Sequence, residues 1–180
     1  MYNIIEYSSR DKLMTEKIKS ISTEAKPEDC YTCLKCTNGC PANKIFEDFA
    51  PHKFQIAAHI GLVDDIIESG ILWYCFNCKT CHTRCPMLTS PVETIQSLTN
   101  IAVERGLTPP KAFTEMIRTI STEGAITKPR EVQTNDFDFV DRDELGLPPR
   151  GVKDVAKFQA ALKEIGALDI LDRKQTEENK

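Results

Sequence analysis

Cys30-Tyr31-Thr32-Cys33-Leu34-Lys35-Cys36-Thr37-Asn38-Gly39-Cys40-Pro41 carries four cysteines in the pattern C-x2-C-x2-C-x3-C and ends in a proline. The same pattern returns 45 residues later, in Cys75-Phe76-Asn77-Cys78-Lys79-Thr80-Cys81-His82-Thr83-Arg84-Cys85-Pro86. The two copies contain all 8 cysteines of this chain of 180 residues, and both trailing prolines match. Chance is a poor explanation for such agreement, so the chain contains an internal repeat built around its cysteines.

This spacing is typical of cubane iron–sulfur sites. Three cysteines at i, i+3 and i+6 offer thiolates to three irons of one [4Fe–4S] cluster, and the fourth iron needs a ligand from elsewhere. In two-cluster ferredoxins the fourth cysteine of each run binds the other cluster, and the proline that follows turns the chain away. The pattern predicts two clusters, the first held by Cys30, Cys33, Cys36 and Cys85 and the second by Cys75, Cys78, Cys81 and Cys40.

Other uses of cysteine fit less well. Residues 1–10 contain Glu6 and no apolar core of a secretory signal, so we expect a cytoplasmic chain with reduced thiols rather than four disulfides. Structural zinc sites pair two short cysteine knuckles across a longer loop, whereas each run here has three closely spaced cysteines and a fourth before proline. A thioredoxin-like redox site needs only two cysteines in a βαβ context.

Composition excludes other partners. The net charge of −4 and the pI near 5.5 argue against nucleic acid, which needs a basic face. The longest apolar stretch, residues 71–76, is far shorter than the roughly 20 residues that span a bilayer. We therefore expect no membrane span.

Several side chains near the cysteines invite a role. Lys35, Lys79 and Arg84 lie inside the runs, where they either raise the potential of an anionic cluster or solvate the loops. The three histidines are not needed as ligands, because four cysteines per cluster are present. We expect Trp73 and Tyr74 to pack over a cluster and exclude water.

The rest of the chain predicts helices and no sustained strand alternation, hence an all-α fold. Expected helices are 51–60 before Gly61, 62–69 before Gly70, 91–105 after a Ser90–Glu93 capping box, 110–123 with Phe113, Met116, Ile117 and Ile120 buried, and 152–165. Residues 125–151 read as a long connector in which Phe137, Phe139 and Val140 could dock onto this domain or onto a partner. We expect a two-cluster helical domain over 1–124, followed by 125–180 with the connector, a helix and a charged tail.

The two runs on a helical scaffold resemble the C subunit of the heterodisulfide reductase of methanogenic archaea, a member of the α-helical ferredoxins. The resemblance is carried by residues 30–41 and 72–86. It implies a non-catalytic electron-transfer role. Electrons would come from the A subunit, which contains flavin and iron–sulfur clusters, and would pass to the catalytic B subunit, which reduces the mixed disulfide of coenzyme M and coenzyme B. A larger complex with a hydrogenase or formate dehydrogenase is compatible with it.

The absent motifs agree with that role. The chain has no adjacent cysteine pair of the CCG kind that holds the catalytic clusters of the B subunit, and no G-x-G-x-x-G for a dinucleotide. Two alternatives remain open: the same subunit role in a related quinone-linked or sulfur-metabolism complex, and a free diffusible ferredoxin.

Overall fold

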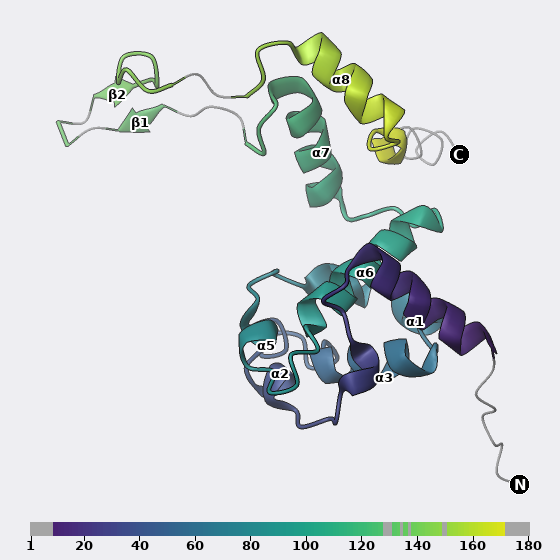
Figure 1. The fold of residues 1–180 in the computed structure, drawn as a ribbon. Helices are drawn as coiled ribbons and strands as arrows, with labels where there is room; N and C mark the ends of the chain where they lie inside the picture. Colours follow the sequence, from purple (N-terminus) through teal and green to yellow (C-terminus); the bar gives the residue numbers. More distant parts are fainter. Residues whose placement is uncertain (1–8, 128–130, 134, 137, 149–150, 172–180) are drawn as a thin grey trace, which may run out of the picture. The chain divides into compact units, whose positions relative to one another are not determined.

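The computed structural model describes residues 9–127, 131–133, 135–136, 138–148 and 151–171. Over these residues the regular secondary structure is helical apart from one pair of two-residue strands, which confirms the all-α prediction. Its contacts group into two compact units, residues 1–107 and 108–180 (Figure 1). The division at residue 124 that we expected from the sequence stays a prediction; a truncation ending there tests it by asking whether both clusters still assemble.

The first unit is built from short helices. They are α1 (Ser9–Ile21), η1 (Pro27–Asp29), α2 (Lys35–Asn38), α3 (Pro51–Ile60), α4 (Asp64–Glu68), η2 (Ile71–Tyr74), α5 (Thr80–Thr83) and α6 (Pro91–Glu104). The bounds of α3 agree with the prediction: Pro51 occupies the first turn, where its missing N–H costs nothing, and Gly61 ends the helix with a φ of 73°. Helix α1 had no sequence prediction.

The core of the first unit lies around α6, which packs against α1, α3 and α4. Ile95, Leu98 and Ile101 of α6 are almost fully buried and meet Ile18 of α1 and Phe54 of α3 in one cluster. These α6 residues recur at intervals of three, which keeps them on one face of the helix. The three long helices thus form a scaffold, and α2 packs against α5 beside it (Figure 1).

The second unit holds α7 (Lys111–Glu123), β1 (Val132–Gln133), β2 (Phe139–Val140) and α8 (Val155–Glu164). Gly124, whose φ of 63° suits glycine, caps the end of α7. Asp154 caps the start of α8, and its carboxylate accepts a hydrogen bond from the Lys157 N–H (3.0 Å). The two helices pack together, and the Gln159 amide donates to the Ser121 carbonyl (3.0 Å).

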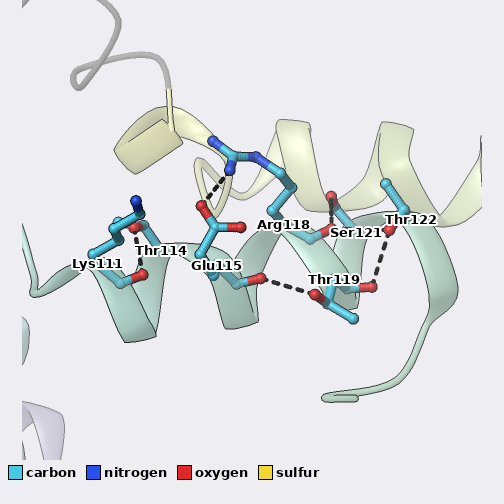
Figure 2. Close-up of polar contacts among 7 residues, drawn as sticks. All are labelled: Lys111, Thr114, Glu115, Arg118, Thr119, Ser121 and Thr122. Carbon is cyan, nitrogen blue, oxygen red and sulfur yellow. Dashed lines mark hydrogen bonds and ion pairs between the residues drawn. The ribbon is translucent and has the colours of Figure 1, made fainter. Parts of the chain in front are cut away.

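The polar side chains of α7 bond within their own helix. Figure 2 shows the Thr114, Thr119 and Ser121 hydroxyls donating to carbonyls three or four residues earlier, at 2.8–2.9 Å. The same view shows Arg118 paired with Glu115 one turn away (2.5 Å). Such bonds satisfy these side chains within the helix itself.

Two details of the second unit differ from the sequence prediction. Phe113 and Met116 are more than a third exposed, and the buried residues of α7 are instead Thr114 and Ser121. The connector contains the antiparallel pair β1–β2, with Gln133 opposite Phe139, where we expected only irregular chain. Strands of two residues are too short to show alternation in a sequence. Phe137 lies outside the described residues.

No helix among the described residues has the length and apolar character needed to cross a membrane.

The α6 core yields a matched pair of substitutions. Leu98→Ala should lower the free energy of unfolding by about 2–5 kcal/mol, because Leu98 is 0% exposed and its loss leaves a cavity. The same change at Leu13, which is 65% exposed, should cost under about 0.5 kcal/mol. Denaturant unfolding of both variants checks this, and equal losses would contradict the assignment of the core.

Candidate metal centre

The two cysteine runs fold alike. Cys30 follows the short helix η1, and Cys75 follows its counterpart η2. The third cysteine of each run, Cys36 or Cys81, is buried within the one-turn helix α2 or α5. The duplication seen in the sequence is therefore also a duplication of local structure.

Both loops reach this shape through the same left-handed residues. Before α2, φ is 60° at Thr32 and 64° at Leu34; before α5, φ is 51° at Asn77 and 58° at Lys79. Left-handed backbone at non-glycine residues costs about 1–3 kcal/mol each and concentrates at functional sites. Because this backbone geometry recurs in both copies, we infer that each loop is shaped to surround a bound group.

The first cavity is surrounded by four cysteines. Cys30, Cys33, Cys36 and Cys85 line a space of about 290 Å³, which includes a part open to solvent. Three of these residues come from the first run and Cys85 comes from the second. Pro91, the first residue of α6, lies on the same wall.

The second cavity repeats this arrangement with the copies exchanged. Cys75, Cys78, Cys81 and Cys40 line a space of about 320 Å³, again partly open to solvent. Pro51, the first residue of α3, is part of its wall. The N-terminus of one long helix therefore borders each cavity, where its unpaired N–H groups favour negative charge.

The two sites lie next to each other. Cys36 and Cys81 share one buried cluster with Val92 of α6. Gly39, which precedes Cys40, and Arg84, which precedes Cys85, also meet: a Cβ on Gly39 would lie 2.6 Å from an Arg84 guanidinium nitrogen. The side chain of Arg84, from the other copy, thus occupies the space that a side chain at residue 39 would fill.

Burial makes most inner thiols hard to ionise in the absence of metal. Burial, together with the neighbouring Cys75, Cys36 and Cys40, raises the pKa of Cys81 to about 12. Burial also raises the pKa of Cys36 and Cys75. These side chains need a positively charged partner to become thiolates, and iron is such a partner.

Two other thiols are stabilised as thiolates by hydrogen bonds. The Thr89 hydroxyl lies 3.2 Å from the Cys85 sulfur and the Thr89 N–H donates to it at 3.4 Å. Burial alone would raise the pKa of Cys85, but the hydrogen bonds from Thr89, together with those from the backbone of Met87 and Leu88, outweigh burial and lower it. At Cys78, the hydroxyl of Thr80 at 3.4 Å lowers the pKa of the thiol.

Two histidines hold the loops rather than face the cavities. His52 Nδ1 lies 2.7 Å from the Thr37 hydroxyl, and His82 Nδ1 lies 2.9 Å from the Ser90 hydroxyl. Thr37 and His82 each follow the third cysteine of a run, so each bond ties a cysteine loop to the start of the next long helix. The capping-box prediction at Ser90 is wrong: Ser90 has a φ of 47° and makes no side-chain cap, because its hydroxyl serves His82.

The aromatic and charged residues that line the cavities differ in part from those that the sequence predicted. Tyr31 and Phe76, which follow the first cysteine of each run, line the cavities. Trp73 and Tyr74 are not among the residues that line these two cavities. The ring of Tyr74 instead stacks on that of Phe46, with 4.2 Å between the ring centroids. Lys79 lines the second cavity, while Lys35 is exposed.

The donor set fits a cubane cluster in each cavity. A [4Fe–4S] cluster needs four thiolates around a body several atoms wide, and each cavity offers four cysteines. Among the described residues, no three His, Cys, Asp or Glu side chains converge closely enough for a single metal ion. Thiolates that surround a cubane are held apart by the cluster itself, so wide spacing is expected there.

Comparison with known proteins agrees with this fit. Residues 29–90 match the family described as a 4Fe-4S dicluster domain. This range contains both cysteine runs and the segment that joins them.

Similar curated proteins come from methanogenic archaea. The chain is 32% identical over 108 residues to the C subunit of the H(2):CoB-CoM heterodisulfide,ferredoxin reductase of Methanothermobacter thermautotrophicus, which covers 60% of this chain and 57% of that protein. It is 32% identical over 158 residues to the C subunit of the ferredoxin:CoB-CoM heterodisulfide reductase of Methanosarcina acetivorans, covering 78% and 62%. With the second iron–sulfur C subunit of the CoB–CoM heterodisulfide reductase of Methanocaldococcus jannaschii, the identity is 38% over 77 residues, covering 43% and 40%.

The chain thus spans less than two thirds of the length of these relatives. The family match spans the eight cysteines around the two cavities, and this dicluster match together with the two groups of four cysteines provides for two [4Fe–4S] clusters. On this evidence the chain contains a 4Fe-4S dicluster domain and is similar to the C subunits of heterodisulfide reductases.

Proposed function

We propose that this chain is a non-catalytic electron-transfer subunit of a cytoplasmic heterodisulfide reductase. Its first [4Fe–4S] cluster is held by Cys30, Cys33, Cys36 and Cys85, and its second by Cys75, Cys78, Cys81 and Cys40. Each cluster, when bound, accepts and releases one electron. The donor is the flavin-containing A subunit, whereas the acceptor is the B subunit, which reduces the mixed disulfide of coenzyme M and coenzyme B. A larger assembly with a hydrogenase or formate dehydrogenase is compatible with this role.

One observation carries this proposal. Each of the eight cysteines lines one of the two adjacent cavities, four to each. All thiols of the chain are then engaged as ligands, which leaves none to act as a nucleophile on a disulfide. The reduction of the substrate therefore belongs to a partner chain.

The exposure of the cysteines supports a role between two partners. Cys33 of the first site and Cys78 of the second are exposed, whereas Cys36 and Cys81 are buried between the sites. Each site thus has one edge open to a docking protein and one edge turned toward the other site. This is the arrangement that a relay with one entry and one exit needs.

Purification from the native host tests the subunit role. We expect the chain to co-purify with a protein carrying CCG motifs and with a flavoprotein, and the complex to reduce the mixed disulfide of coenzyme M and coenzyme B. A chain that elutes alone as a monomer would point to a diffusible ferredoxin. Turnover of quinone or of a sulfur compound, without heterodisulfide reduction, would assign it to a related complex.

The metal content has its own expected value. Anaerobically isolated protein should hold about eight irons, four for each cubane, and should give cubane EPR signals on reduction. Iron analysis and EPR spectroscopy measure both quantities. Zinc in place of iron would refute the proposed cofactor.

The exchange of ligands predicts an unequal result for two substitutions in one run. Cys36→Ser should abolish or shift the EPR signal of the first cluster, whereas Cys40→Ser should act on the second. Cys85→Ser should affect the same signal as Cys36→Ser, and Cys81→Ser the same signal as Cys40→Ser. If Cys36→Ser and Cys40→Ser perturb one common signal, each run binds its own cluster and the assignment is wrong.

The buried thiols predict how the iron-free protein responds to pH. The pKa of Cys81 rises from 9.0 to about 12 on folding, so the folded state favours the neutral thiol. Its contribution to stability is complete below pH 9 and is lost as the pH rises toward 12, because the unfolded thiol ionises first. The melting temperature of the iron-free, reduced protein should therefore fall above pH 9, and Cys81→Ala should weaken that dependence.

Cys78→Ala is the matched control, because the pKa of this exposed cysteine is lowered rather than raised. It should leave the fall of the melting temperature at alkaline pH in place. An equal slope in the wild type and in Cys81→Ala would show that Cys81 ionises as freely in the folded state as in the unfolded one.

A further inference from the structure

A chain of buried hydrogen bonds ends on one of the cysteine sulfurs. Thr94 of α6 bonds to the Gln55 carbonyl oxygen at 3.0 Å, and the Gln55 amide nitrogen of α3 lies 3.2 Å from both the Thr89 carbonyl and the Thr89 hydroxyl. That hydroxyl lies 3.2 Å from Cys85 Sγ. These hydrogen bonds link α3 and α6 to Cys85, the cysteine of the second run that lines the first cavity.

The direction of each bond follows from the chemistry of the groups. The Thr89 carbonyl can only accept, so the Gln55 atom facing it is the amide nitrogen, and the Gln55 oxygen faces Thr94. Thr94 must then donate to that oxygen. Thr89 Oγ1 accepts from the Gln55 amide, which leaves its own proton for the sulfur of Cys85.

Water has no access to replace the bonds among Gln55, Thr89 and Thr94. Gln55 and Thr94 are 0% exposed and Thr89 is 1% exposed. Hydrogen bonds in such surroundings are stronger than in water, and aligned bonds polarise one another. The Thr89 N–H adds a second bond to the same sulfur at 3.4 Å.

Among the described residues, the second site has no counterpart of this series of hydrogen bonds. The residue 45 positions before Thr89 is Lys44, which is exposed. Within the described residues, no hydrogen bond reaches the sulfur of Cys40, the residue that corresponds to Cys85. The hydroxyl that does reach a sulfur of the second site, Thr80 on Cys78, serves an exposed cysteine, where water competes.

We propose that Gln55 and Thr94 are positioning residues that hold the Thr89 hydroxyl on Cys85 Sγ and thereby raise the reduction potential of the first cluster relative to the second. This inference rests on the ligand assignment of the proposed function. Reduction places additional negative charge on the cluster and its sulfurs, and a donor aimed at a sulfur stabilises that charge. Because the donor is oriented before the electron arrives, the reduced form gains more from it than the oxidised form.

Four variants of the full chain test the proposal by EPR-monitored redox titration of both clusters. Thr89→Val removes the hydroxyl and keeps the shape, so it should lower one midpoint potential, that of the signal which Cys36→Ser affects. Thr89→Ser keeps the hydroxyl and should restore most of the shift. Gln55→Met should lower the same midpoint, and Gln55→Met combined with Thr89→Val should shift it no further than Thr89→Val alone, because Gln55 acts through Thr89.

Thr80→Val is the matched control on the second site and should leave the midpoint of the first cluster unchanged. The proposal is overturned if Thr89→Val moves neither midpoint or both equally, or if Thr89→Ser shifts the potential as far as Thr89→Val. Additive shifts of Gln55→Met and Thr89→Val would also overturn it. Where Gln55→Met does not fold, the comparison of Thr89→Val with Thr89→Ser decides the matter.

Failure of this inference differs from failure of the proposed function. Eight irons and two EPR signals with an unmoved midpoint in Thr89→Val would refute the tuning and leave the electron-transfer role intact. Protein without iron would refute both.

Discussion

Each cavity is lined by three cysteines of one copy of the repeat and one cysteine of the other, and the packing of the first unit brings these residues together. Cys85 must come to the loop of residues 30–36, and Cys40 must come to the loop of residues 75–81. Neither loop can bring its missing cysteine by local folding. The scaffold of α1, α3 and α6 supplies the long-range packing that does so, with Leu98 and Ile101 at its centre.

The two copies are equivalent in backbone and different in side chains. Left-handed residues and one-turn helices recur at the same places in both loops. Gly39 of the first copy makes room for Arg84 of the second. Each loop is also bonded to the start of the next long helix, but Thr37 bonds to a histidine whereas His82 bonds to a serine. The two copies of the repeat therefore form two sites that differ in the side chains around them.

The sequence predicted the chemistry of the site better than its surroundings. The spacing of the cysteines and the prolines at residues 41 and 86 predicted two cubane sites, because a cubane imposes local distances that recur as sequence intervals. Helices α3 and α6 were also predictable, since proline at their start and left-handed backbone at their end are local signals. The prediction that Phe113 and Met116 are buried was wrong. An apolar stripe indicates which face of a helix can be buried, but it does not indicate whether another element of the same unit covers that face.

The roles of the polar residues around the cavities could not be predicted from the sequence. Gln55, Thr89 and Thr94 look like ordinary helix and loop residues until α3, α6 and the segment after Cys85 are brought together. Ser90 carried a local signal for a helix cap, and a residue distant from that signal, His82, took its hydroxyl instead. By itself the sequence determined the number of cysteines, their grouping into two runs and the helical class, because these follow from short intervals along the chain. Only the tertiary structure decided which hydrogen bonds reach which sulfur, because those bonds join groups that are neighbours in space and not in sequence.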